Sequence, residues 1–227
     1  MNNSAFVGVS LDSASFSREW VRAALHHLLS QHDSLLLVLA DQLLAYNKTA
    51  VLTVSPARID LETAKVKIDQ RCNDISTFLR KEIAFLDKGD RERVHIARWE
   101  DFSDASYSKM LRELRIAYSA IEEFRCCVDH DASFHFERHL GNSRNADRHH
   151  ELCVSYVLDE TAMDIRITEL AGYSFEYYPE DHIRTLTHLY EDRFANFGLT
   201  VSKLVGQSAK RVFQPFYLAS RPQTGKH

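Results

Sequence analysis

The run 35-LLLVLA-40 constrains the fold more than any other stretch of this chain. It is continuously apolar, and Asp41 ends it far short of the roughly 20 residues that a membrane helix needs. A short apolar run of this kind is typical of a strand buried on both faces, as in parallel sheets covered by helices. We therefore expect an α/β protein and no membrane-spanning segment.

Strand and helix patterns alternate around this run. Residues 5–9 are apolar and β-prone, and the apolar residues from Trp20 to Leu29 recur at helical spacing. Further helices are expected at 59–86 (closed by Gly89), 107–127, 147–164 and 181–195, and further strands at 94–99 and 173–178. This order predicts a doubly wound parallel sheet whose ligand site lies outside the carboxyl ends of its strands.

Composition narrows the class of protein. Only 7 of 227 residues are Gly and 4 are Pro, and no linker interrupts the body, so we expect one domain over 1–220 and a disordered tail at 221–227. A net charge of −4 excludes the global positive field of a general nucleic-acid binder but permits a local basic patch. The four cysteines form no CxxC pair, and no basic residue precedes the first apolar run, which favours a cytoplasmic protein.

Ser10 follows the first expected strand, in 8-GVS-10. The loop there has neither a GxGxxG fingerprint nor a P-loop, so a nucleophilic Ser10 would need a substrate that is already activated, such as an ester. A serine nucleophile also needs a base or help from the substrate, and no GxSxG elbow surrounds Ser10. A serine at a strand end more often caps a helix or turn, so both interpretations stay open.

Two later clusters combine phenols with carboxylates. Tyr156 and Glu160 share one helical face and could together bind an ammonium group, although an ordinary amphipathic helix with a solvated Glu explains the same spacing. In 175-FEYYP-179, alternation places Glu176 and Tyr178 on one face of a strand. Tyr is common in strands, so this cluster is not decisive alone.

Taken in order, these elements resemble the cyclodipeptide synthase family, which has a GVS serine near the N-terminus, a Tyr-x-x-x-Glu helix late in the chain and a Tyr shortly after it. The Tyr178-Pro179 pair is similar to the Tyr-Pro subfamily, and Ser13 stands where the other subfamily has Asn. The resemblance spans roughly residues 4–215, and its specificity depends on Gly8, Val9, Ser10, Phe16, Tyr156, Glu160, Tyr178 and Pro179.

The resemblance implies a Rossmann-like fold similar to the catalytic domain of class I aminoacyl-tRNA synthetases, without their ATP-binding signatures. It implies an aminoacyltransferase that uses two aminoacyl-tRNAs, forms an aminoacyl-enzyme and then a dipeptidyl-enzyme on Ser10, and releases a cyclic dipeptide. No cofactor is implied, and the family resemblance favours a monomer.

Roles for individual residues are also implied by the resemblance. Tyr156 and Glu160 would hold the amino group of the first aminoacyl moiety, with Glu160 accepting a proton and Tyr178 relaying one during ring closure. The substrate-binding set would comprise Phe6, Gly8, Ser13, Met163, Glu176 and Pro179. A carboxylate inside a side-chain pocket is costly without a polar or cationic partner, so Glu176 indicates a polar or basic residue in the product.

The tRNA surface is less well marked in the sequence. Lys67 and Arg71 share a face of the long charged helix and are our candidates for tRNA contacts, although a solvated, salt-bridged helix is the commoner explanation. Arg91, Arg93 and Arg98 are substitutes. The five histidines between His130 and His150 match no zinc motif, so we expect a solvated loop and no metal site.

Two other functions fit the same residues. Ser10 could serve a serine acyltransferase or esterase that acts on small activated esters, but no histidine has an evident sequence context near it. Alternatively, the chain could be a non-catalytic module that binds tRNA or a nucleotide at its strand ends. In that case Ser10→Ala would leave the cellular effect intact.

Overall fold

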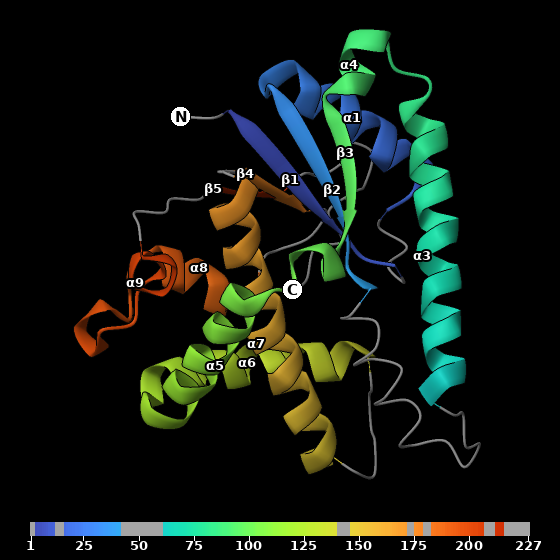
Figure 1. The fold of residues 1–227 in the computed structure, drawn as a ribbon. Coiled ribbons are helices and arrows are strands. Elements are labelled where there is room, and N and C mark those ends of the chain that lie inside the picture. Colours follow the sequence, from blue (N-terminus) through green and yellow to red (C-terminus); the bar gives the residue numbers. More distant parts are fainter. Residues whose placement is uncertain are drawn as a thin grey trace, which may run out of the picture.

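The computed structural model describes residues 3–11, 16–41, 61–139, 146–171, 175–178, 183–206 and 212–215. Within these ranges a parallel sheet forms the centre of the molecule (Figure 1). Its strands are β1 Ser4–Val9, β2 Ser34–Leu39, β3 Val94–Arg98, β4 Phe175–Tyr178 and β5 Val212–Pro215, in the order β3-β2-β1-β4-β5. The expected Rossmann-like α/β fold is therefore confirmed, although β5 was not predicted from the sequence.

Helices cover both faces of this sheet (Figure 1). They are α1 Arg18–Gln31, α3 Leu61–Ile83, α4 Lys88–Glu92, α5 Ala105–Ala120, α6 Glu122–His139, α7 Ala146–Ala171, α8 Arg184–Tyr190 and α9 Val201–Val205, with short 3₁₀ turns at Trp99–Phe102 and Ala195–Phe197. One hydrophobic core joins α1 and α3 to the sheet, and a second core joins α5, α6, α7 and α8 to its other face.

The strand register decides which side chains enter which core. Phe6 pairs with Leu36 and with Glu176, and partners at one register of parallel strands project to the same face. Phe6 and Leu36 belong to the core that contains α7, whereas Val7 belongs to the core that contains α1. The buried carboxyl group of Glu176 is therefore on the α7 side of the sheet.

The 35-LLLVLA-40 run forms β2, and its residues Leu35 to Leu39 are at most 5% exposed. They alternate between the two cores. The run is thus buried on both faces, as the sequence predicted. No helix within the described ranges is long and apolar enough to cross a membrane.

Several predicted boundaries are wrong. The long charged helix ends at Ile83, and Gly89 lies inside the short helix α4 instead of closing α3. The predicted His-rich loop is largely helical, because after a break at Ile121 the chain continues as α6. A narrow stripe on α6 packs inward despite the polar composition, and it consists of Phe124, Cys127, Val128, Asp131 and Ala132.

The last two predicted helices also differ from the observed ones. Helix α7 continues to Ala171, beyond the predicted end at 164, and α8 covers only Arg184–Tyr190 of the predicted 181–195. Strand β4 covers Phe175–Tyr178 of the predicted 173–178, and residues 172–174 lie outside the described ranges. The predicted tail at 221–227 also lies outside the described residues.

His32 joins α1 to the sheet through a buried hydrogen-bond chain. Its Nδ1 lies 2.9 Å from Asn3 Oδ1, and its Nε2 lies 2.8 Å from the hydroxyl of Tyr177 in β4. The amide of Asn3 donates to the Gln31 carbonyl, so its oxygen faces His32 and accepts from the Nδ1 proton. Nε2 then accepts from the Tyr177 hydroxyl, and the imidazole is neutral.

Burial lowers the pKa of His32 below its ordinary value of 6.5. A histidine whose pKa is lower in the folded state stabilises the fold fully above the unfolded pKa, and the stabilisation is lost as the pH falls through the folded pKa. We predict that an NMR titration of the His32 ring will give a pKa below 6.5. A value above 6.5 would contradict the neutral hydrogen-bonded imidazole.

Candidate active site

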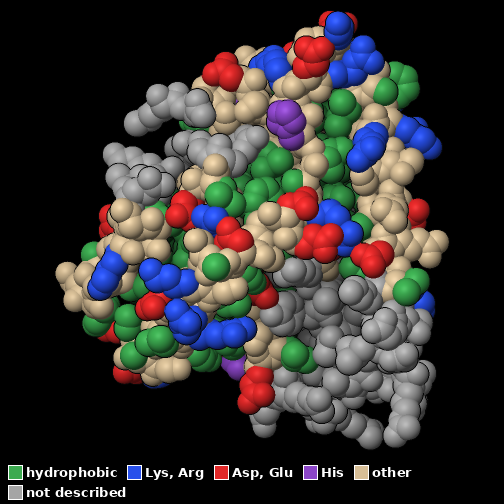
Figure 2. All heavy atoms as spheres, in the orientation of Figure 1, with side chains coloured by type: hydrophobic (Ala, Val, Ile, Leu, Met, Phe, Trp, Pro, Cys, Tyr) green, Lys and Arg blue, Asp and Glu red, His purple; other side chains and the backbone are tan. Residues whose placement is uncertain are grey.

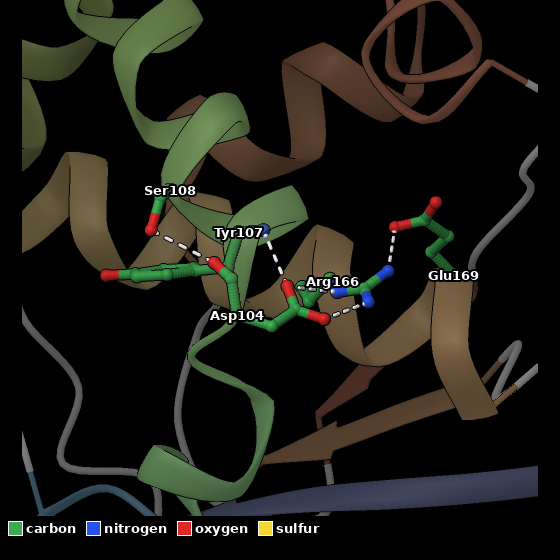
Figure 3. Close-up of polar contacts among 5 residues, drawn as sticks. All are labelled: Asp104, Tyr107, Ser108, Arg166 and Glu169. Atoms are coloured by element: carbon green, nitrogen blue, oxygen red, sulfur yellow. Dashed lines mark hydrogen bonds and ion pairs between the residues drawn. The ribbon is translucent and has the colours of Figure 1, made fainter.

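The position of α7 over the sheet depends on Arg166, whose side chain is only 8% exposed. Figure 3 shows its guanidinium between the carboxylates of Asp104 and Glu169. Arg166 Nε donates to Asp104 Oδ1 over 3.1 Å, and the same oxygen accepts from the Tyr107 backbone N–H over 2.9 Å, which caps α5. One carboxylate therefore fixes both the start of α5 and the C-terminal half of α7.

Two further contacts hold the helices around the site. The hydroxyl of Tyr107 donates to Asp159, the residue before Glu160. Asp131 on α6 accepts from the backbone N–H and the hydroxyl of Thr185, both at 2.7 Å. Asp131 thus serves the first turn of α8, where Ile183 at the N-cap offers no side-chain acceptor. Each of these acidic groups has a defined donor.

Glu160 is in a different position. Its Oε2 atom is buried and finds no hydrogen-bond donor among the described residues. Desolvation raises the pKa of Glu160 well above its ordinary value, and the nearby carboxylates raise it further, in the order Asp164, Glu176, Asp131 and Asp159. A buried, unsatisfied carboxyl group among other acids is a site for a cation or for a proton.

Tyr156 lies one turn before Glu160 on α7 and is half-buried. The ring of His135 on α6 stacks on it, with the centroids 4.0 Å apart and the planes at 22°. His135 was assigned to a solvated loop from the sequence, and that assignment is wrong. The contact fixes the ring plane of the phenol, so α6 contributes to the site as well as α7.

Ser10 directly follows the last residue of β1 at the carboxyl edge of the sheet and is half-buried. Two residues earlier, a Cβ added to Gly8 would meet no atom within 4 Å, so there is open space above this strand position. Gly8 follows Phe6 on the face that packs against α7. Leu11, the residue after Ser10, is buried, and its carbonyl accepts from Arg71 Nε over 2.9 Å.

Tyr178 lies at the end of β4, next to β1. Its ring packs edge-on against Phe16 with centroids 5.7 Å apart, and Phe16 also packs edge-on against Trp20 at 5.1 Å. Phe16 precedes α1, so this aromatic contact joins the end of β4 to the connection between β1 and α1. Ser10 and Tyr178 therefore end two neighbouring strands.

The remaining predicted residues are distributed as follows. Phe6 and Met163 are fully buried and Glu176 is 5% exposed, all in or beside the α7 core. Lys67 and Arg71 are exposed on α3. Ser13 and Pro179 lie outside the described residues.

Several residues of the site were missed from the sequence. They are the buried acids Asp131, Asp159 and Asp164 and the aromatic partner His135. A sequence signal for two of them was present, because Asp159 and Asp164 lie in 152–167, a stretch that is rich in apolar residues. A charged residue in such a stretch indicates a structural or functional partner.

Cationic side chains do not form a single basic surface on the face drawn in Figure 2, where Lys and Arg are interspersed with Asp and Glu. Arg93 donates to the carbonyls of Leu29 and Asp33 over 2.8 and 3.0 Å. Arg98 bonds Asp41 and Asp69, each over 2.8 Å. These two arginines, which the sequence offered as substitutes for tRNA contacts, therefore hold the fold together.

The described strands and helices form a Rossmann-like fold, which resembles the fold of class I aminoacyl-tRNA synthetases. A tyrosyl-tRNA synthetase from Archaeoglobus fulgidus, solved with L-tyrosine, superimposes with a TM-score of 0.56 at 13% identity, over 88% of this chain and 53% of that one. A cyclodipeptide synthase from Fluoribacter dumoffii is more similar, with a TM-score of 0.73 at 15% identity over 93% of this chain and 88% of that one. The likeness of these structures establishes the fold.

A cyclodipeptide synthase from Candidatus Glomeribacter gigasporarum, solved with bound Phe-tRNAPhe, superimposes with a TM-score of 0.66 at 13% identity over 100% of this chain and 92% of that one. The sequence profile of the cyclodipeptide synthase family matches residues 2–196. The chain therefore belongs to this family of tRNA-dependent aminoacyltransferases that make cyclodipeptides. The comparison with curated proteins returns no match.

The buried carboxyl of Glu160 leads to a stability prediction. An acid whose pKa is raised in the folded state favours folding below its unfolded pKa, and this contribution is lost as the pH rises through the folded pKa. Gln resembles the protonated acid, so Glu160→Gln should match the wild type near pH 4 and exceed it increasingly from pH 5 to 8. In a chain of this size each 1 kcal/mol gained raises Tm by ~2–4 °C.

Thermal unfolding followed by circular dichroism across this pH range tests the prediction. Glu169→Gln is the matched control. Glu169 is paired with Arg166, so this variant should be less stable than the wild type at neutral pH. Equal Tm values for Glu160→Gln and wild type at pH 8 would show that the Glu160 carboxyl is not destabilised by its surroundings.

Proposed function

We propose that this enzyme joins two aminoacyl groups from aminoacyl-tRNAs into a cyclic dipeptide through covalent intermediates on Ser10. The observation that carries the proposal is the buried carboxyl of Glu160, which has an unsatisfied oxygen and lies among acids. The open space above Gly8 is on the same side of the sheet, and Ser10 follows at the strand end. An α-ammonium group bound at Glu160 would supply the missing donor.

In the first step, Ser10 Oγ attacks the ester carbonyl of an aminoacyl-tRNA. A new ester forms on Oγ, the bond to the terminal ribose oxygen breaks, and that oxygen leaves with the proton that the serine hydroxyl loses. One ester is exchanged for another, so the step is nearly balanced and needs no ATP. The absence of GxGxxG and P-loop motifs from the sequence agrees with this chemistry.

Glu160 and Tyr156 are the proposed ammonium site. A cation at Glu160 would relieve both its desolvation and the repulsion from its acidic neighbours, so binding and ionisation of the carboxyl should reinforce each other. Tyr156, whose ring plane is set by His135, would fix the direction of the amino group. This positioning lowers the entropic cost of the reaction.

Two amide-forming steps follow. The amine on Ser10 must first lose a proton, and Glu160 is the proposed acceptor. The amine then attacks the second aminoacyl ester, and the ribose oxygen of the second tRNA leaves with the proton that the amine gave up, which gives a dipeptidyl ester on Ser10. The new terminal amine attacks that ester, the C–O bond to Ser10 breaks, and Tyr178 relays the proton of this amine to Ser10 Oγ while the ring closes. Ester-to-amide conversion drives both steps forward.

The finer assignments belong to the same proposal. Tyr178-Pro179 and Ser13 support the Tyr-Pro subfamily, and residues 1–220 would act as one catalytic domain of a monomer that needs no cofactor or metal. Lys67, exposed on α3, is the proposed tRNA contact on that helix. Phe6, Gly8 and Met163 would form the apolar part of the pocket for the first side chain.

Ser10→Ala tests the covalent mechanism. Expressed in a bacterial host, whose charged tRNAs supply every substrate, the wild-type chain should release a diketopiperazine that mass spectrometry detects in the medium. Ser10→Ala should abolish it, because no ester can form. Ser17→Ala is the control, since Ser17 only caps α1 and should leave the product unchanged.

Other outcomes separate the competing functions. A soluble wild-type protein that makes no cyclic dipeptide from individually charged tRNAs but hydrolyses small esters would identify an esterase. Among the described residues, however, no histidine is hydrogen-bonded to Ser10 that could act as its base. A cellular effect that survives Ser10→Ala would indicate a binding module.

Glu176 makes a prediction about the product. Its carboxyl is buried on the α7 side next to Phe6, and it contributes to the field around Glu160. A pocket with this carboxylate favours a polar or basic side chain. We expect the product to contain such a residue, and Glu176→Leu to lower its yield at least tenfold or to shift the product to apolar residues. A small aliphatic product that Glu176→Leu leaves unchanged would refute this assignment.

A further inference from the structure

Arg71 is hydrogen-bonded to the backbone of the residue that follows Ser10, the proposed nucleophile. Its Nε donates to the carbonyl oxygen of Leu11 over 2.9 Å, across 60 residues of sequence. Leu11 follows Ser10 directly and is 2% exposed. The carbonyl lies just beyond the end of β1, where the ladder of the sheet has ended, so it needs a partner from elsewhere. Arg71 supplies that partner.

The same part of α3 is attached to two more strand ends. Arg98, the last residue of β3, bonds Asp69 on α3 and Asp41, which follows β2. Asp41 has a side chain only 4% exposed, so this pair is largely withdrawn from solvent. Because Asp69 and Arg71 are two residues apart, one turn of α3 is joined to the carboxyl ends of β1, β2 and β3.

These contacts limit where Ser10 can move. The Leu11 carbonyl belongs to the second peptide group after the Ser10 Cα, so its direction restricts the backbone on the carboxyl side of the serine. On the amino-terminal side of Ser10, Gly8 has no side chain that could pack against neighbouring residues. Without the Arg71 hydrogen bond, the serine would be held mainly by β1 and by the burial of Leu11.

We propose that Arg71 is a positioning residue that holds the Ser10 segment in the geometry needed for acyl transfer. This proposal depends on Ser10 being the nucleophile, and it replaces the prediction that Arg71 is primarily a tRNA contact. Misplacing a reacting atom by about 1 Å can cost ~100-fold in rate. Lys67, one turn earlier on α3, has no such role.

Two substitutions of nearly equal shape separate the hydrogen bond from the charge. Gln has its side-chain nitrogen at the position of Arg Nε, so Arg71→Gln keeps a neutral donor there, whereas Arg71→Met fills the same space without a donor. The probe is a dinitrobenzyl ester of an amino acid found in the product, which can acylate Ser10 without any tRNA. Intact-protein mass spectrometry follows the aminoacyl-enzyme over time.

With the small ester, Arg71→Met should acylate ~10–100-fold more slowly than wild type, with a similar half-saturating ester concentration. Arg71→Gln should remain within about threefold of wild type, and the control Lys81→Met, at an exposed position of the same helix, should equal it. With aminoacyl-tRNA, Lys67→Met should raise KM and weaken its salt dependence. If Arg71→Met reacts with the ester as the wild type does, and only its KM for tRNA rises, the proposal is overturned.

Hydrogen exchange provides a second readout that does not need catalysis. Amide exchange in the segment that contains residues 9–11 should be faster in Arg71→Met than in Arg71→Gln or wild type, while exchange in β3 stays unchanged. Unchanged exchange in residues 9–11 would contradict the proposal. If wild type shows this protection but is never acylated at Ser10, the proposed function fails while the contact itself is confirmed.

Discussion

The ion pair between Arg166 and Asp104 joins two of the helices that cover one face of the sheet. Asp104 both caps α5 and receives the buried guanidinium of α7, so the two helices cannot shift independently. The guanidinium of Arg166 is largely withdrawn from solvent, so its two carboxylate partners, Asp104 and Glu169, offset the cost of burying its charge. Glu160 and Tyr156 lie about two and three turns before Arg166 on this helix. The contact between Arg166 and Asp104 therefore also restricts the position of these two residues along the helix axis.

A site crowded with carboxylates raises the question of how the fold tolerates them. The acids with structural roles have their donors inside the protein, as Thr185 serves Asp131 and Tyr107 serves Asp159. Among the described residues, Glu160 has an oxygen without a donor, and burial and the neighbouring carboxylates both disfavour its charged form. This difference between Glu160 and the other acids fits a substrate that has an ammonium group, since the cost of burying Glu160 is then offset only when the substrate is bound.

The sequence predicted the elements whose patterns arise from burial alone. The run at 35–40 predicted a doubly buried strand because it is short and continuously apolar, and Ser10 was placed correctly at a strand end because the first apolar run ends there. Helix α6 was missed because its inward stripe is narrow and its outer residues are polar. The roles of Arg98 and His135 could not be predicted either, because each depends on a partner far away in sequence, and periodicity contains no information about such pairs.

The loop after β1 shows how the same fold can serve different chemistry. In dinucleotide-binding relatives of this architecture, glycines let the loop approach a pyrophosphate, and the phosphate helps to hold the loop. The sequence of this chain has no glycine fingerprint after the first strand, and the described residues on either side of residues 12–15 are held by protein groups. The Leu11 carbonyl is bonded by Arg71, and Phe16 packs on Tyr178. Helix α3 thus contacts the backbone next to Ser10, the proposed nucleophile, at a place where dinucleotide-binding proteins use a bound phosphate.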